Sequence, residues 1–320
     1  MKLQVPFPMI YLPRYLAMEP EAKIGFWGEF EVIKKTRGII TQRLKFKNVI
    51  TDVGLKYLAE HIVSVGDVTN YCQLGTGATV PTSSDVALET FGTNKSYNDH
   101  TSSLGSTNDR YYKVEFEFGL ADAIGTWTEL GMSWDYGSGS NVFCRMLFKD
   151  DEGNPTSIIK TADDTMTIIY YLHVVRSSDT PTENTITVDG TDYTVQSLIL
   201  NRCLENGASS SYAFNNLHYG YRAKLGTGTN ALSTTQTACH TPIATDPTLY
   251  SVVSYVTGAF YREFMFEFPA SVTGNIAEFC FPILYNSANI AMRFPTPIPK
   301  TDTTKKIRLQ PRITYGRAAA

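Results

Sequence analysis

The chain has 320 residues, of which 42% are hydrophobic and 18% are charged, and its formal net charge at pH 7 is −3. Such a small net charge gives no global electrostatic basis for binding nucleic acid or a membrane surface. No apolar run approaches the roughly 20 residues of a membrane span. Low charge combined with many Thr, Tyr and Val residues is typical of a β-rich protein, and the length suits two domains better than one core.

Residues 1–25 are predicted to form an extended N-terminal arm. Three prolines, Pro6, Pro8 and Pro13, interrupt any continuous apolar helix of the kind that a signal peptide needs. An apolar tail is seldom ordered alone, and the fixed φ angles of proline lower the entropy lost on docking. We therefore expect the arm to pack on another subunit or another protein; the alternative is that it folds back on its own domain. The predicted interface residues are Phe7, Ile10, Tyr11, Leu12 and Tyr15.

Residues 26–176 are predicted to form a first β domain, which we name the first repeat. It begins with a hairpin whose turn is centred on Arg37. This register places Glu31 opposite Arg43 on one face and pairs apolar residues on the other face.

A short helix is predicted after the hairpin, capped by Thr51 or Asp52. A Leu-Gly-Thr-Gly turn at 74–77 then precedes a capping-box pattern at 82–85, and the polar residues 94–108 are expected to form a loop. Period-two alternation and β-forming residues predict the remaining strands of this repeat. These strands span residues 113–118, 127–134, 142–148 and 165–174.

Residues 177–183 are the predicted linker, followed by a second β domain at 184–317, the second repeat, and a short tail at 318–320. Asp189-Gly190 predicts a tight hairpin turn at the start of the second repeat. Further strands are predicted at residues 263–268, 276–284, 290–294 and 306–315.

The second repeat copies the first. Leu74-Gly75-Thr76-Gly77 recurs as Leu225-Gly226-Thr227-Gly228, and Phe116-Glu117-Phe118 recurs as Phe266-Glu267-Phe268. Further matches keep the same order, and the offset drifts only from 151 to 148 residues, as small loop deletions in a duplicated domain would produce. We therefore predict a mainly β protein of two tandem, duplicated β-sandwich-like domains with short helices and an extended arm. Phe116 and Phe266 should occupy equivalent core positions.

Six recurring residues are assigned structural roles in the repeat: Gly75, Gly77, Gly226, Gly228, Glu129 and Glu278. The glycines lack the remaining residues of a dinucleotide or P-loop motif, and we attribute them to a turn that uses the freedom of glycine at positive φ. The glutamates lie in apolar strands, so we expect each to be buried and to accept backbone N–H groups within its own domain. A general acid is the alternative.

The other chemistry-bearing residues predict no catalytic site, no cofactor and no metal site. The five cysteines show no C-x-x-C spacing and are interpreted as reduced, buried side chains; they are Cys72, Cys144, Cys203, Cys239 and Cys280. No histidine recurs between the repeats or has metal-ligand spacing. Basic clusters at 34–37 and 300–308 are interpreted as solvated faces or subunit contacts rather than nucleic-acid sites.

The order of hairpin, short helix, glycine turn and meander resembles a family of virion structural proteins from tailed bacteriophages. Three stretches carry the resemblance: Asn-Val-Ile-Thr-Asp-Val-Gly-Leu at 48–55, the segment 74–88 from Leu-Gly-Thr-Gly through Pro81 to Ala-Leu, and 116–131 with Phe-Glu-Phe and Trp-Thr-Glu-Leu-Gly. It covers most of 26–174 and, more weakly, 185–315. The resemblance implies a structural protein of the virion tail or neck.

We therefore expect an assembly subunit of a phage tail, neck or collar, without catalytic activity, made in the host cytoplasm and located in the virion. It would build a ring or sleeve or anchor tail fibres, binding copies of itself and other tail or portal-proximal proteins. No specific nucleic acid and no membrane insertion are expected. The alternative is a receptor- or carbohydrate-binding module that contacts the host cell surface through loops 97–112 and 209–221.

Overall fold

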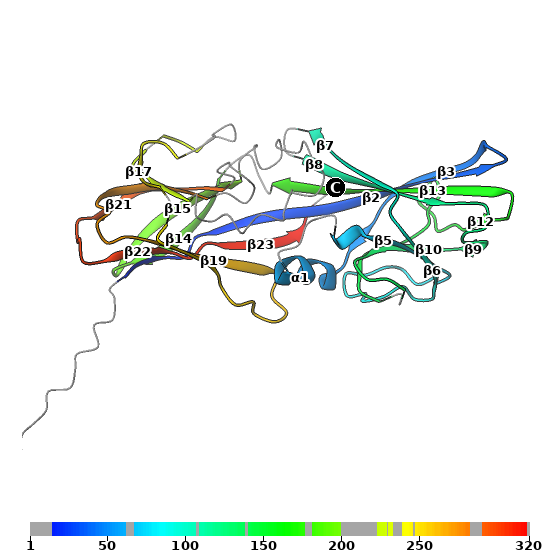
Figure 1. Cartoon of the computed structure of the whole chain (residues 1–320), viewed down its shortest axis with the longest axis horizontal. Helices are drawn as coiled ribbons and strands as arrows, with labels where there is room; N and C mark the ends of the chain where they lie inside the picture. Colours follow the sequence, from blue (N-terminus) through cyan, green and yellow to red (C-terminus); the bar gives the residue numbers. More distant parts are fainter. Residues whose placement is uncertain are drawn as a thin grey trace, which may run out of the picture.

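The computed structural model describes residues 15–61, 67–106, 109–137, 140–176, 181–199, 223–228, 230–232, 239–245, 247–281 and 290–318. This part of the chain is mainly β, as predicted, and the molecule is elongated (Figure 1). Its α-helix, α1 (Asp52–His61), and a 3-10 helix, η1 (Asp67–Thr69), both lie in the first repeat.

The strands that precede residue 177 are β1 (Tyr15–Met18), β2 (Glu21–Thr36), β3 (Ile39–Lys47), β4 (Val49–Ile50), β5 (Tyr71–Gly75), β6 (Phe91–Ser96), β7 (Asp99–Ser106), β8 (Asp109–Phe118), β9 (Gly125–Trp127), β10 (Glu129–Ser133), β11 (Val142–Leu147), β12 (Ile158–Lys160) and β13 (Asp164–Arg176). Those that follow are β14 (Thr182–Val188), β15 (Thr191–Ile199), β16 (Lys224–Gly226), β17 (Pro242–Thr245), β18 (Leu249–Val252), β19 (Tyr261–Phe268), β20 (Gly274–Phe281), β21 (Ile290–Lys300), β22 (Lys306–Leu309) and β23 (Arg312–Arg317).

The 16-residue strand β2 joins the two repeats into one ten-stranded sheet, whose main order is β1-β22-β19-β23-β2-β13-β8-β7. Apolar or small residues occupy every second position from Ala22 to Val32, which is the pattern of a strand with one face in a core. On one side β2 pairs with β13 of the first repeat, and on the other side it pairs with β23 of the second repeat. The two repeats are therefore not separate bodies on a linker.

The directions of the strands beside β2 show that the two repeats are inverted relative to each other. Strand β13 runs antiparallel to β2, whereas β23 runs parallel to it. Gly25 lies opposite Val175 on β13 and opposite Gly316 on β23, so the inversion is centred near this residue. Equivalent ends of the repeats therefore lie at opposite ends of the molecule, as Figure 1 shows for β12 and the end of β21.

The second sheets of the two repeats confirm the duplication. The five-stranded sheet has the order β4-β11-β10-β5-β6, and the six-stranded sheet contains β15-β21-β20-β16-β17 in the corresponding places. Glu129 lies opposite Gly75 in the first repeat, and Glu278 lies opposite Gly226 in the second. The strand registers of the two repeats therefore place the repeated glutamates and glycines at equivalent positions.

The predicted equivalence of Phe116 and Phe266 agrees with the structure. Both side chains are buried. Each lies two residues before a second phenylalanine: Phe118 pairs with β13, and Phe268 pairs with β22 in the matching register. The ring centroid of Phe266 lies 5.3 Å from that of Phe279 on β20, so the two sheets pack face to face as in a sandwich. Most buried apolar residues of both repeats belong to one hydrophobic cluster, which explains why the chain does not separate into two independent cores. A small second cluster contains Leu198, Cys239, Cys280 and Ala291.

The helix α1 and the second-repeat hairpin match their predictions. Thr51 caps α1, because its Oγ1 accepts a hydrogen bond from the Gly54 N–H at 3.0 Å. The turn at Asp189-Gly190 has positive φ at both residues, as a two-residue hairpin turn requires.

Three local predictions in the first repeat were wrong. The β2–β3 turn is the two-residue turn Arg37-Gly38, and a bulge near Lys34 places Glu31 opposite Lys45. The ion pair between Glu31 and Arg43 still forms, as a diagonal contact. Residues 91–106 form the strands β6 and β7 rather than a loop, because these polar segments pair with β5 and β8. The capping-box residues 82–85 start no helix.

The predicted arm is shorter than expected. Residues 15–18 form β1 and pair in parallel with β22, and residues 21–26 pair in parallel with β23. Leu16 and Met18 are buried in the core of the same chain, so this part of the arm packs on the second repeat and not on another subunit. Residues 1–14, with Phe7, Ile10, Tyr11 and Leu12, lie outside the described residues.

Candidate functional site

The two repeated glutamates mark equivalent sites, one in each repeat, where a loop crosses the second sheet. Glu129 begins β10 and Glu278 lies within β20, and their exposed fractions are 0% and 1%. The prediction that both are buried is therefore confirmed, and the surroundings of each show what its carboxylate does.

The carboxylate of Glu129 binds groups from three backbone positions and one guanidinium. Its Oε1 accepts the N–H groups of Gly77 at 3.0 Å and Thr90 at 2.8 Å. Its Oε2 accepts the N–H of Glu89 at 3.2 Å and Nε of Arg145 at 2.7 Å. Each oxygen has two donors, so this carboxylate is fully engaged in holding the loop between β5 and β6 against the sheet.

Arg145 extends the site into a cluster of three carboxylates around one buried guanidinium. Only 3% of its side chain is exposed, and it lies 2.7 Å from Asp85 and 3.5 Å from Glu89. Burial acts to lower the pKa of Arg145, but hydrogen bonds to Asp85 and Glu129 raise that pKa above its usual value. Burial acts to raise the pKa of Asp85, but hydrogen bonds from Arg145 and Thr82 hold that pKa below its usual value.

This arrangement is suited to holding a loop and not to proton transfer. A general acid must present its proton to a substrate, whereas both oxygens of Glu129 face protein donors in a closed site. Hydrogen bonds from the backbone and the hydroxyl of Thr79 also lower the pKa of Glu89, which keeps this carboxylate charged.

The repeated glycines are needed for close approach, and our attribution to positive φ was wrong. None of Gly75, Gly77, Gly226 and Gly228 is among the positive-φ residues. A Cβ on Gly75 or Gly77 would lie 2.6 or 2.5 Å from Oε1 of Glu129. In the second repeat, a Cβ on Gly226 or Gly228 would lie 2.4 or 2.3 Å from atoms of His240.

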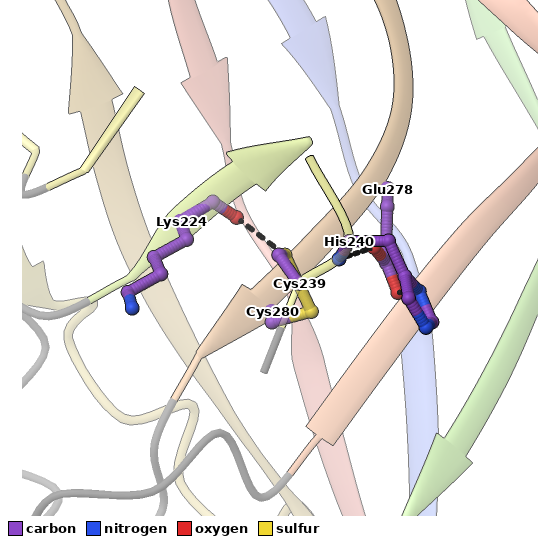
Figure 2. Close-up of a disulfide and its surroundings, with 5 residues drawn as sticks. All are labelled: Lys224, Cys239, His240, Glu278 and Cys280. Atoms are coloured by element: carbon purple, nitrogen blue, oxygen red, sulfur yellow. Dashed lines mark hydrogen bonds and ion pairs between the residues drawn. A yellow bond between two sulfur atoms is a disulfide. The ribbon is translucent and has the colours of Figure 1, made fainter. Parts of the chain in front are cut away.

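The second site has sulfur and imidazole beside the repeated glutamate. Arg293, which corresponds to Arg145, lies opposite Glu278 in the register of β20 and β21. Glu278 accepts the backbone N–H of His240 at 2.6 Å, and Nδ1 of the same histidine lies 3.4 Å from Glu278 Oε1 (Figure 2). Beside them Cys239 and Cys280 form a disulfide, and Sγ of Cys239 lies 3.3 Å from the carbonyl oxygen of Lys224. The interpretation of all five cysteines as reduced was therefore wrong for this pair, which 41 residues separate in the sequence.

The backbone hydrogen bonds establish which residues of the two sites correspond. Thr76 N–H donates to Thr90 O at 2.9 Å, and Thr227 N–H donates to Thr241 O at 3.1 Å. The residue before each acceptor, Glu89 or His240, donates its N–H to the repeated glutamate. The disulfide correspondingly replaces a packed Leu88–Gly131 pair, since a Cβ on that glycine would lie 3.2 Å from the leucine Cδ2.

Sequence reasoning missed several of these residues. The recurrence of Arg145 as Arg293 could have indicated that this arginine belongs to the repeated site. Nothing in the sequence indicates that Arg145 pairs with Asp85, because the two lie 60 residues apart in the sequence. A second missed pair is Lys160 and Lys300: both are buried and donate to equivalent carbonyls, Leu120 O at 3.3 Å and Ala270 O at 3.2 Å. These lysines bind the backbone, so Lys300 does not belong to a solvated basic face.

Tyr15 is the one predicted interface residue that the structure describes. The guanidinium of Arg308 lies 3.7 Å from the centroid of its ring, and its strand pairs with β22 of the same chain. Arg308 and Lys306 also pair with Glu267, at 2.7 and 3.5 Å, which accounts for much of the predicted basic cluster.

Comparison of the chain with protein-family models, curated proteins and solved structures finds no match in any of the three. No helix within the described residues is long and apolar enough to cross a membrane.

Proposed function

We propose that this protein is a structural assembly subunit of a tailed-bacteriophage virion, located in the tail, neck or collar. It builds a ring or sleeve or anchors tail fibres, and it contacts copies of itself and other tail or portal-proximal proteins. The sequence resemblance supports the phage assignment, and the use of both repeated glutamates for internal contacts supports a structural role over an enzymatic one.

An exposed apolar surface at one end of the molecule is the observation that carries the assembly role. We name it the end patch; its residues have exposed fractions between 53% and 72% and are Ile39, Ile40, Leu120, Ile124 and Ile159. The β2–β3 turn, β12 and the 119–124 turn meet there: Lys34 Nζ bonds Ile159 O at 3.1 Å, and Lys160 Nζ bonds Leu120 O. Grouped exposed apolar side chains of this kind mark interaction sites.

The described residues at the opposite end of the molecule include no such patch. Strand register and the matched lysines place Ala270, Thr273 and Pro299 where the first repeat has Leu120, Ile124 and Ile159. Among the described strands, the second repeat's part of the ten-stranded sheet has no hairpin corresponding to the tip of β2 and β3. Two unequal ends favour a heterologous, head-to-tail contact, and such contacts form rings when the rotation closes.

Sedimentation velocity on the purified chain tests the assembly role. The unaltered protein should form a high-order oligomer, and Ile40→Lys combined with Ile159→Lys should leave a folded monomer. Val256→Lys is the matched control, because Val256 is 54% exposed but lies outside the end patch. Mass spectrometry and cryo-EM of the phage particles should locate the protein in the tail or neck. A monomer that binds host-surface glycan, or absence from the particle, would contradict the proposal.

A further inference from the structure

We propose that the second repeat binds a zinc ion through Cys239, His240, Glu278 and Cys280 when its two cysteines are reduced. These residues come from the segment before β17 and from β20, and Figure 2 shows the side chains of His240 and Glu278 beside each other, next to the Cys239–Cys280 bond. The proposed site is structural: it fixes the loop against the sheet, where the first repeat uses Arg145.

Three of the four donors lie close enough together for one metal ion, and the fourth, His240, contacts one of them. The sulfur atoms of Cys239 and Cys280 and a carboxylate oxygen of Glu278 all lie within 4.8 Å of one another. Nδ1 of His240, buried and without a hydrogen bond within the described chain, lies 3.4 Å from Glu278 Oε1. Zinc binds sulfur, nitrogen and oxygen at about 2.0–2.3 Å in a tetrahedron, so its ligands lie roughly 3–4 Å apart. A movement of the His240 imidazole from Glu278 toward the two sulfur atoms would complete the site.

The first repeat provides an internal reference for these four positions. It holds Leu88, Glu89, Glu129 and Gly131 where the second repeat holds Cys239, His240, Glu278 and Cys280. The glutamate is retained, and the three differences introduce two thiols and one imidazole, which are the side chains that zinc prefers. Packing alone does not require this combination, because Leu88 and Gly131 fill the same space.

Burial and access also fit a closed structural site. Cys239, Glu278 and Cys280 are buried, whereas 34% of the His240 side chain is exposed. The histidine is therefore the donor of the proposed site that solvent reaches most easily. Four protein ligands leave no position for a substrate, which distinguishes a structural zinc site from a catalytic one.

The disulfide and the zinc site are mutually exclusive. Reduction of the Cys239–Cys280 bond takes two electrons and two protons from a dithiol, which becomes oxidised to its own disulfide. The two thiols formed then lose their protons as Zn²⁺ binds, so that two Zn–S bonds replace two S–H bonds. Either form connects the segment before β17 to β20.

Metal titration of the full chain tests the proposal. Protein reduced with dithiothreitol, then freed of the reductant under anaerobic conditions, should bind about one zinc ion per chain. Cobalt(II) should give tetrahedral d–d absorption bands and thiolate-to-cobalt charge transfer. The variant Cys239→Leu with Cys280→Gly carries the residues of the first repeat and should lose both the stoichiometric zinc and the charge-transfer band.

Control variants separate this site from other thiols and from misfolding. Cys203→Ser and Cys144→Ala should retain the metal, and His240→Ala, at a partly exposed position, should weaken zinc binding at least tenfold. Zinc should raise the melting temperature of the reduced wild type and leave that of the Leu/Gly variant unchanged. Equal metal binding by wild type and the Leu/Gly variant, or no cobalt charge transfer in reduced wild type that retains its circular dichroism spectrum, would overturn the proposal.

Discussion

The two repeats share a scaffold but complete their part of the large sheet differently. The first repeat uses β2, which leads directly into its own hairpin and runs antiparallel to β13. The second repeat uses β1 and the start of β2, which precede the first repeat in the chain and run parallel to β22 and β23. The second repeat therefore depends on residues almost 300 positions earlier, and a duplicated sequence does not produce two autonomous domains.

The sites around the repeated glutamates differ in a complementary way. In both repeats a segment with two glycines is closely approached by another group, the Glu129 carboxylate in the first repeat and His240 in the second, and the glycines and glutamates are retained. The side chains around the carboxylate differ: Arg145, itself paired with Asp85 and Glu89, contacts Glu129, whereas His240 contacts Glu278 beside the Cys239–Cys280 bond. Close backbone approach is thus the constant requirement, whereas the chemistry of the cluster varies.

Removal of residues 1–24 should have the largest effect on this pair of repeats. It deletes β1 and the part of β2 beside β23, with the buried side chains Leu16, Met18, Ala22 and Ile24. Burial of the three larger side chains contributes roughly 4–9 kcal/mol before ordering costs, which is comparable to the whole stability of a domain, about 5–15 kcal/mol. Circular dichroism and solubility should report an unfolded or aggregated second repeat.

Removal of residues 1–14 is the matched control, because it leaves β1 and β2 intact. This shorter deletion should keep the melting temperature of the full chain. It also tests whether Phe7, Ile10, Tyr11 and Leu12 are needed for assembly, as the sequence predicts. Equal stability of the two deletion variants would mean that the second repeat does not need β1 and the start of β2.

Glu129→Gln should have the next largest effect, lowering the free energy of unfolding by about 3–5 kcal/mol. The amide removes the most buried of the three counter-charges of Arg145 and turns an N–H group toward backbone donors. Urea denaturation measures the loss, with the exposed Glu117→Gln as the control. A loss below about 1 kcal/mol would be the value for an ordinary surface ion pair and would refute the loop-holding role.

Gly77→Ala should destabilise the chain by about 1–3 kcal/mol, the usual cost of overpacking. The new methyl group would meet Oε1 of Glu129 and Cβ of Glu89, both 2.5 Å away. Gly119→Ala is the control, since its nearest neighbour is 3.6 Å away and its φ is not positive. Thermal unfolding should separate the two variants, and Gly228→Ala should resemble Gly77→Ala if the second repeat has the same requirement.

The sequence predicted the duplication well because identical residues at matching positions record it directly. The registers of Glu129 with Gly75 and of Glu278 with Gly226 follow from the same matches. The sequence did not predict that β1 and the start of β2 pair with β22 and β23. Alternation of apolar and polar residues begins at Ala22, but no local pattern indicates parallel pairing with the C-terminal strands. The Cys239–Cys280 bond and the contact of Asp85 with Arg145 also depend on tertiary proximity between distant segments.

Asp85→Asn should give the smallest effect and should show how far the first site depends on pH. The pKa of Asp85 is lower in the folded chain, because hydrogen bonds from Arg145 and Thr82 outweigh the effect of burial. Its stabilisation is therefore present above the unfolded pKa, near 3.9, and is lost as the pH falls through the folded pKa. At pH 7 the variant should lose about 1 kcal/mol of stability, and the difference in stability from wild type should close toward pH 2.

The second repeat has Gln236 at the matching sequence position, so acid should weaken the first site before the second. Urea denaturation at pH 7, 4 and 2 measures this trend, with Asp151→Asn, an exposed carboxylate, as the control. A gap that stays constant across the three pH values would show that Asp85 contributes through shape and not through its charge.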